Sequence, residues 1–135
     1  MSDTPPSTDG TLDSVLGFEL TELGPELAQG RFEVGSRHKQ PYGLVHGGVY
    51  AALAETVTSV ATAQAVLADG NIAVGLSNNT SFMRPATSGH VHAEARARHR
   101  GRTTWVWDVD MTDDDGRLCA ISRVTIAVRA APGAR

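Results

Sequence analysis

The sequence is poor in cysteine, in aromatic residues and in long apolar runs, and its charges nearly balance. One of its 135 residues is a cysteine, and 5% are aromatic. Because Cys119 has no second cysteine to pair with, neither an internal disulfide nor a cysteine-based zinc cage can form. No apolar run approaches the ~20 residues of a membrane span. The 12 basic and 15 acidic residues give a net charge of −3, which argues against a dedicated nucleic-acid-binding domain.

Length and the character of the two ends predict the domain organisation. Residues 1–10 and 130–135 are polar and aperiodic, so we expect two tails around a single domain at 11–129. The first ten residues lack the charged leader and apolar core of a signal peptide, and we expect a cytoplasmic protein. A chain of 14.2 kDa buries roughly two-thirds of its unfolded surface, enough for one core. A large ligand must therefore bind in a surface groove or between subunits.

One long helix is predicted at residues 49–68. Val49, Leu53 and Val57 recur at helical spacing, and Asp69-Gly70 ends the pattern. A helix at the surface normally carries a charged face. Because Glu55 is the only charged residue of this segment, we expect the helix to be enclosed over most of its circumference.

Most of the remaining sequence shows the period of two that is typical of β-strands. Val91, Ala93 and Ala95 alternate with charged residues, and their small side chains leave room for a helix to lie close to a sheet. A long helix against a curved antiparallel sheet is an α+β architecture. Strands are predicted at 18–23, 27–34, 72–84, 90–100, 104–111 and 118–128, with a short helix at 11–16 and a hairpin turn at 113–116.

The residues best suited to chemistry lie within one window around the predicted helix start. Backbone N–H groups at a helix start lack intrahelical partners, and a glycine lets a ligand approach them closely. Such a start can polarise a carbonyl oxygen. A carboxylate on an otherwise uncharged helix is a candidate general base or nucleophile, although it could equally make a structural hydrogen bond. The window contains Gln40, His46, Gly47, Gly48, Glu55 and Ser59.

Two other clusters admit a metal-binding interpretation that we do not favour. His90 and His92 share one strand face, but no third ligand is in view, so exposed histidines are the simpler interpretation. The acidic run Asp113 to Asp115 is too short for a calcium loop and fits a hairpin turn. We therefore expect neither a metal nor another cofactor.

The segment LVHGGVYAALAETVTS, together with SFMRPATSGHVHAEARARHRGRTTWVWDVDMTDDDGRLCAISRVTI, resembles the hotdog-fold acyl-CoA thioesterase superfamily. Within it, the chain is most similar to the branch of 4-hydroxybenzoyl-CoA thioesterases that use a glutamate, related to the phenylacetate-pathway thioesterases. The likeness covers roughly residues 15–129. It implies a five- or six-stranded sheet wrapped around the central helix, and pairing as a homodimer, commonly as a dimer of dimers in a homotetramer.

The resemblance also implies roles for individual residues. Gly47 is similar to the glycine whose N–H polarises the thioester carbonyl, and Glu55 to the acid that attacks it or activates water. Gln40 matches a glutamine near the thioester, and His46 a residue that shapes the helix entry. Ser59 stands where relatives often have threonine. In the family, the glycine and the acid of one site come from different subunits.

Further residues are expected to contact the coenzyme A part of the acyl-CoA substrate. Arginine suits the phosphates of that group because its planar fork donates paired hydrogen bonds. The alternatives are solvated side chains for the arginines and a satisfied strand end for Asn78 or Asn79. The predicted substrate and coenzyme A contacts, with the asparagine expected in the acyl pocket, are Gly48, Asn79, Arg84, Arg102 and Thr103.

Two other functions are compatible with the same fold. An enoyl-thioester hydratase or dehydratase could use His46 with Glu55, although position 60 is Val where the hydratases place a histidine. A non-catalytic acyl-CoA-binding module could use the same groove. Release of free thiol from a thioester panel distinguishes hydrolysis from both.

Overall fold

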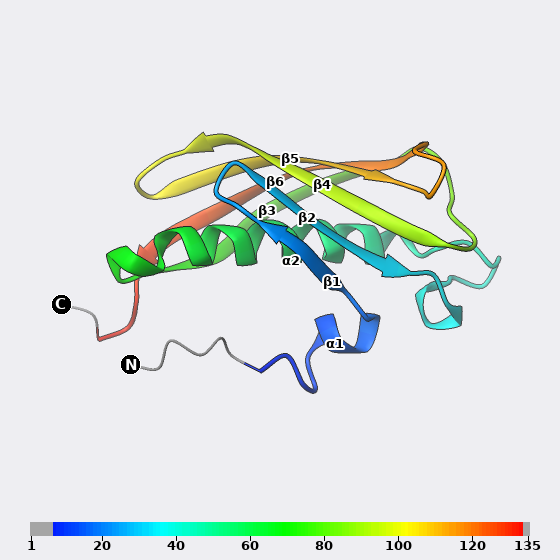
Figure 1. Ribbon diagram of the computed structural model, residues 1–135, viewed down its shortest axis with the longest axis horizontal. Coiled ribbons are helices and arrows are strands. Elements are labelled where there is room, and N and C mark those ends of the chain that lie inside the picture. The colour runs from blue at the N-terminus through cyan, green and yellow to red at the C-terminus, as the bar shows by residue number, and fades with distance from the viewer. Residues whose placement is uncertain (1–6, 134–135) are drawn as a thin grey trace.

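A computed structural model describes residues 7–133 of the chain, in which a six-stranded antiparallel sheet wraps around one long helix (Figure 1). The helix is α2, Gly47–Val66, and the order of strands across the sheet is β1-β2-β4-β5-β6-β3. The predicted α+β class and hotdog arrangement are confirmed. The strands are β1 Glu19–Leu23, β2 Leu27–Glu33, β3 Asn71–Phe82, β4 His90–Arg100, β5 Thr104–Thr112 and β6 Leu118–Ala130.

Short helices complete the chain. The predicted N-terminal helix is confirmed as α1, Leu12–Leu16, which begins after the Thr11 cap and ends at Gly17 in the left-handed region, φ 67°. Two 3-10 helices follow, η1 at Ser36–His38 and η2 at Leu67–Asp69. Of the two expected tails, residues 1–6 and 134–135 lie outside the described residues, and β6 continues to Ala130.

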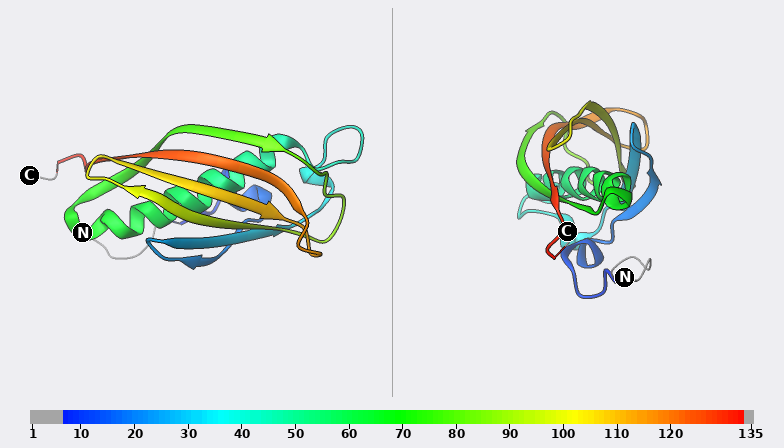
Figure 2. Two further views of the ribbon diagram at one scale, coloured as in Figure 1. Left: turned by 90° about the horizontal axis from the view of Figure 1, so that it is seen from above. Right: turned by 90° about the vertical axis from the view of Figure 1, so that its left-hand side faces the viewer.

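The core lies between α2 and the concave face of the sheet. Leu53 and Val57 of the helix are fully buried against the sheet, where Ala93 and Ala95 present the predicted row of small side chains. Gly30 of β2 permits the same close approach, because a Cβ there would lie 2.7 Å from a methyl group of Val57. The small residues thus let the helix lie low in the curved sheet (Figure 2).

The core also contains a polar connection between helix and sheet. The Trp107 indole Nε1–H donates to Thr62 Oγ1 at 2.9 Å, and the Thr62 hydroxyl donates to the Thr58 carbonyl at 2.7 Å. All three side chains are buried. Because a buried polar group is costly without a partner, these bonds fix the helix against β5. Trp107 is fully buried in this core.

The helix α2 is not enclosed all round: nine of its 20 residues are buried, and Gly48, Glu55, Gln64 and Ala65 are exposed. The sheet covers one side of the helix, and α1 lies on the other side, where Thr56 Oγ1 donates to Asp13 Oδ1 at 2.7 Å (Figure 1). Between them Glu55 is exposed, and Ala52 and Ser59 are only half-buried. The side of α2 that carries Glu55 is therefore open to solvent.

The helix, with the 3-10 turn that follows it, is longer and more apolar than predicted, and the expectation that no apolar run approaches a membrane span does not hold. Gly47–Asp69 is long and apolar enough, by length and composition alone, to cross a membrane. In the fold it is the central helix of the sheet, with Leu53, Ala54 and Val57 fully buried. Its apolar character is accounted for by that core position.

The strand β3 forms one edge of the sheet and exposes apolar side chains. It pairs only with β6, and its pairing shifts register between Gly75 and Ser77, where one extra residue forms a bulge. An edge strand presents unpaired backbone groups to solvent or to another chain. The exposed apolar side chains on and just after it are Ile72, Val74, Leu76, Phe82 and Met83.

Candidate active site at the central helix

The helix start has the geometry of a carbonyl-binding site. α2 begins at Gly47, two residues earlier than predicted, with His46 as its N-cap. The Gly48 N–H donates to His46 Nδ1 at 2.8 Å, and the Val49 N–H donates to the His46 carbonyl at 3.0 Å. The Gly47 N–H has no acceptor among the described residues. Of these three N–H groups, Gly47 is thus the one left to bind a ligand oxygen, where the helix dipole is positive.

A buried histidine, which the sequence analysis missed, holds the loop that leads to this start. His38 accepts a hydrogen bond from the Gly35 N–H at Nδ1, 2.9 Å, so its Nε2–H donates to the Leu16 carbonyl at 2.7 Å. Its own carbonyl accepts from the His46 N–H at 2.7 Å. A neutral imidazole with both nitrogens satisfied thus ties α1, the loop and the helix cap together. A single histidine in an irregular segment carries no signal for this role.

Gln40 belongs to the same loop. Its N–H donates to the Leu44 carbonyl at 2.8 Å, and its side-chain oxygen accepts from the Tyr42 N–H. The side chain is half-buried, and its amide nitrogen makes no hydrogen bond within the described residues. Gln40 is therefore fixed close to the helix entry, with both N–H donors of its side-chain amide free among the described residues.

Glu55 lies on the open side of α2, with its carboxyl group over β3. A Cβ on Gly75 would lie 3.5 Å from the Glu55 carboxyl carbon and 3.6 Å from Oε2. No hydrogen bond or ion pair of this carboxylate occurs within the described residues, so a structural bond does not occupy it. Ser59 follows one turn later on the same face. The buried hydroxyl of Thr58, in contrast, bonds to carbonyls of its own helix.

Gly47 and Glu55 of one chain lie far apart along the helix. They are eight residues apart on a continuous helix, which at 1.5 Å per residue is a rise of about 12 Å. The two groups of one chain are therefore not side by side.

An aromatic ring covers the other side of the helix start. A Cβ on Gly47 would lie 2.7 Å from Cζ of Phe82, the last residue of β3. The same ring lies 6.1 Å from the ring of Tyr50, whose hydroxyl accepts from the Ala86 N–H at 3.2 Å. Burial raises the pKa of Tyr50, which keeps this hydroxyl protonated. A side chain at position 47 would therefore have to displace the Phe82 ring, which is exposed.

The predicted coenzyme A contacts lie at two opposite ends of the helix. Arg84 is exposed just beyond β3 at the helix start, where its N–H donates to the Cys119 carbonyl at 3.2 Å. Arg102 and Thr103 form the β4–β5 turn, and the Thr103 carbonyl accepts from the Val128 N–H near the end of β6. That turn lies at the far end of α2 from the helix start (Figure 1). One chain therefore does not bring Arg84 and Arg102 together.

The two neighbouring asparagines of β3 point to opposite faces. Asn78 Nδ2 donates to the Ala51 carbonyl of α2 at 2.9 Å. Asn79 is exposed and lines a hollow of about 560 Å³ on the outer face of the sheet, together with Arg123. The predicted contact Asn79 is therefore not beside the helix, and Asn78 takes that place. The bulge at Gly75 to Ser77 decides which of them faces inward.

The histidine pair and the acidic turn form a structural contact. His92 Nε2 lies 2.7 Å from Asp114 Oδ1, and the His90 N–H donates to Asp114 Oδ2 at 3.0 Å. The hydrogen bond from His92, followed by that from the His90 backbone, lowers the pKa of Asp114. Asp113 accepts from the backbone of Arg117 and closes the predicted hairpin. Within residues 7–133, no three histidine, cysteine or acidic side chains are grouped to hold a metal.

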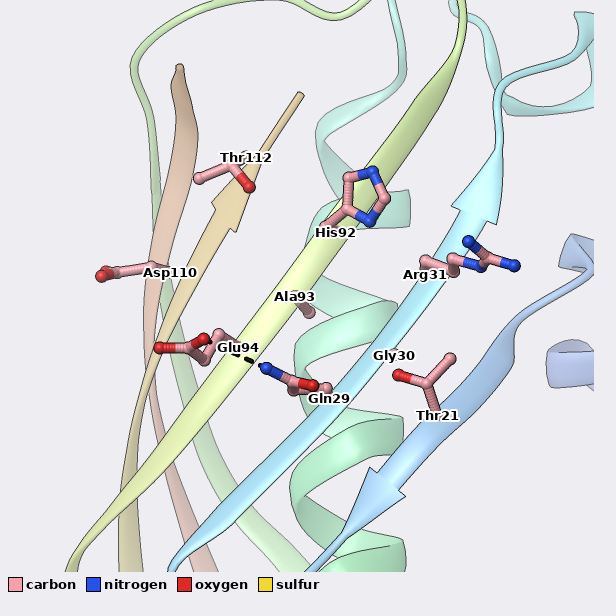
Figure 3. Close-up of a pocket in the computed structure, with 9 residues that line it drawn as sticks. All are labelled: Thr21, Gln29, Gly30, Arg31, His92, Ala93, Glu94, Asp110 and Thr112. Atoms are coloured by element: carbon pink, nitrogen blue, oxygen red, sulfur yellow. Dashed lines mark hydrogen bonds between the residues drawn. The ribbon is translucent and has the colours of Figure 1, made fainter. Parts of the chain in front are cut away.

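Two further hollows lie away from the helix start. The first, of about 280 Å³, is on the outer sheet face, where Gln29, His92 and Glu94 project from the strands and α2 lies behind them (Figure 3). The second, of about 670 Å³, runs between α1, β1 and α2. Its apolar lining includes Phe18, Leu20, Leu23 and Val60. Neither hollow is lined by Gly47 or Glu55.

Comparisons with known proteins find similar sequences and similar folds. The sequence profile of the thioesterase superfamily matches residues 42–120. The proofreading thioesterase EntH of Cronobacter turicensis is 40% identical over 88% of this chain and 86% of its own. A mutant form of the thioesterase PA1618 from Pseudomonas aeruginosa superimposes with a TM-score of 0.85 at 38% identity, over 90% of this chain and 87% of its own. The thioesterase HI1161 from Haemophilus influenzae gives 0.85 at 36%, over 91% and 85%.

Proposed function

The chain belongs to the thioesterase superfamily and is a thioester hydrolase, and we propose that it cleaves acyl- or aryl-coenzyme A thioesters with Gly47 and Glu55 as its central groups. The observation that carries this proposal is the pairing of a free N–H at the start of α2 with an exposed, unbonded carboxylate on the same open side. No metal or organic cofactor takes part in the proposed reaction.

The proposed mechanism divides activation and attack between these groups. The Gly47 N–H and the helix dipole draw electrons onto the thioester carbonyl oxygen, and one such donor is worth about 3 kcal/mol in the transition state. Glu55 then either adds to the carbonyl carbon, giving a mixed anhydride that water hydrolyses, or takes a proton from a water molecule that adds directly. In both routes coenzyme A leaves as the thiol. His46 holds the helix entry in shape, and Gln40 and Ser59 are placed to orient the thioester and the water.

We propose that each active site is shared between two copies of the chain. The rise of about 12 Å between Gly47 and Glu55 within one helix supports a site to which a partner supplies one of them. The open side of α2 and the apolar edge strand β3 are adjacent surfaces on which a second copy can pair. A tetramer made of two such dimers stays a prediction.

The same pairing would assemble the coenzyme A site. Arg84 lies at one end of α2, and Arg102 and Thr103 at the other. Two chains that pair antiparallel along β3 place the far end of one beside the helix start of the other. We propose that Arg84 and the partner's β4–β5 turn bind the phosphates, and that Gly48 lies along the pantetheine arm.

The apolar hollow between α1, β1 and α2 is our candidate for the acyl group. Thr56 and Val60 of α2 line it together with residues of α1 and β1. Its lining of Phe18, Leu20 and Leu23 favours a hydrocarbon or aryl group over a charged one.

Replacement of Glu55 tests the proposed chemistry. Glu55→Ala should lower kcat by about 10²–10⁴-fold, with acyl-CoA binding retained. The measurement is free-thiol release from a panel of aryl- and aliphatic acyl-CoA thioesters, with binding followed by calorimetry. Full turnover by Glu55→Ala would exclude its proposed role.

Co-expression of two inactive variants tests the shared site. Chains carrying Glu55→Ala and chains carrying Gly47→Ala form mixed dimers in which one of the two sites keeps both groups. Random pairing should therefore restore about a quarter of the wild-type activity. If each site lay within one chain, the mixture would be as inactive as its parents.

A further inference from the structure

We propose that Asn78 is a positioning residue that holds the helix turn bearing Glu55 against β3, an inference that rests on the proposed role of Glu55. Asn78 does not reach the reacting atoms. It acts on the backbone of α2, one turn before the carboxylate. The side chain therefore sets where Glu55 stands rather than what Glu55 does.

The strand β3 contacts α2 at three points spaced one helical turn apart. Phe82 lies against Gly47, Asn78 bonds to Ala51, and Gly75 lies under the carboxyl group of Glu55. Residues four apart lie on one stripe of a helix, so β3 follows the stripe that carries both proposed active-site groups. The relative position of strand and helix therefore fixes the helix start and the acid together.

The bulge in β3 makes this series possible. In a regular strand, side chains alternate between the two faces, so Gly75 and Asn78, three apart, would point in opposite directions. The extra residue between Gly75 and Ser77 shifts the alternation, and both positions then face the helix. Glycine at 75 keeps the strand from covering the carboxylate.

A chain of hydrogen bonds fixes the orientation of the Asn78 amide. Thr80 Oγ1 donates to Asn78 Oδ1 at 2.7 Å, and it lies 2.6 Å from the hydroxyl of Ser122, which is buried. Because Thr80 uses its proton toward Asn78, Ser122 is the donor to Thr80. The Asn78 oxygen is thus occupied, and its nitrogen is directed at the Ala51 carbonyl.

The acceptor of this bond, the Ala51 carbonyl, is also the helical hydrogen-bond partner of the Glu55 backbone. In an α-helix the Glu55 N–H donates to the Ala51 carbonyl, four residues earlier. A carbonyl oxygen has two lone pairs, so Ala51 accepts from Glu55 and from Asn78 at once. In the described residues, this is the hydrogen bond that a side chain of β3 donates to the backbone of α2, and it lies one turn before Glu55.

The experiment compares Asn78→Ala with Asn71→Ala, the same change on the same strand at a side chain without a hydrogen bond in the described part of the chain. Hydrolysis of benzoyl-CoA and hexanoyl-CoA is followed by thiol release. We expect Asn78→Ala to lower kcat by about 10-fold to 10²-fold, since small displacements of a reacting group cost this much, while KM stays unchanged. Asn71→Ala should keep both constants.

A second pair of variants keeps the test decisive if Asn78→Ala does not fold, as judged by circular dichroism. Thr80→Val removes the hydroxyl that orients Asn78 and should lower kcat in the same way. Thr80→Ser keeps the hydroxyl and should retain kcat. A merely structural role would lower the melting temperature in both Asn78→Ala and Thr80→Val without this selective loss of kcat.

The outcomes separate this inference from the proposed function. If Glu55→Ala is inactive while Asn78→Ala, or Thr80→Val in its place, keeps the wild-type kcat, the positioning inference is overturned and the function stands. If Glu55→Ala remains fully active, both fail. If Asn78 acts through Glu55, the double variant Glu55→Ala/Asn78→Ala should be no less active than Glu55→Ala alone.

Discussion

The two sides of the central helix have opposite properties. The side that faces the sheet is buried and mostly apolar, and the polar connection from Trp107 to Thr62 on it is satisfied. The open side carries Ala52, Glu55 and Ser59, and its single charged group has no partner in the described residues. One helix thus combines a closed side that holds the fold with an open side that we assign to the reaction.

This difference shows how a chain of 135 residues can have both a core and a site. Stability arises where atoms are removed from water and packed closely. A reactive carboxylate needs access to substrate, so it cannot share that environment. Substitutions on the closed side should therefore change the free energy of unfolding, and substitutions on the open side should change turnover.

The largest effect on stability is expected on the closed side. Leu53→Ala removes a fully buried side chain and should lower the free energy of unfolding by about 2–5 kcal/mol. Ser59→Ala on the open side should change it by less than about 0.5 kcal/mol. Urea denaturation measures both. Similar losses in the two variants would break the distinction between the sides.

The next effect is expected at the helix start, where packing and chemistry meet. Gly47→Ala should lower kcat/KM by about 10²–10³-fold, since the methyl group crowds the free N–H. It should also lower the melting temperature, because the new Cβ meets Phe82 at 2.7 Å. In Gly47→Ala/Phe82→Ala the melting temperature should recover and the activity should not. Recovery of both would mean that packing alone requires the glycine.

A smaller loss is expected from the polar contact within the closed side. Thr62→Val leaves the Trp107 indole N–H buried without an acceptor and should cost about 1–3 kcal/mol of stability. Thr62→Ser keeps the hydroxyl and serves as the control. Thermal unfolding compares the two, and equal stability of the valine and serine variants would contradict the role of this bond.

The smallest effect is expected at Asp114, remote from both sides of the helix. The hydrogen bond from His92, with that from the His90 backbone, lowers the pKa of Asp114 in the folded state. This contribution to stability is present above the ordinary value of 3.8 and is lost as pH falls through the lower folded pKa. Asp114→Asn should therefore weaken the pH dependence of the melting temperature below pH 3.8. An unchanged profile would show that the contact contributes nothing.

Most of the secondary structure could be predicted because its patterns are local. The alternation in β4 and β5 and the helical spacing in α2 gave strands and a helix close to those observed. The helix start was placed two residues late, because Gly47 and Gly48 have low helix propensity and their position depends on the His46 cap. Which of Asn78 and Asn79 faces the helix could not be predicted, because alternation cannot reveal a bulge.

The α+β class and the single acid on an uncharged helix can be predicted from the chain alone, since period and composition are properties of neighbouring residues. Only the folded molecule shows which side of that helix stays open, that Phe82 and Asn78 lie along the stripe of Gly47 and Glu55, and that Arg84 and Arg102 lie at opposite ends. These relations join residues far apart in the chain. They depend on strand order and on one bulge, which arise only when the sheet closes around the helix.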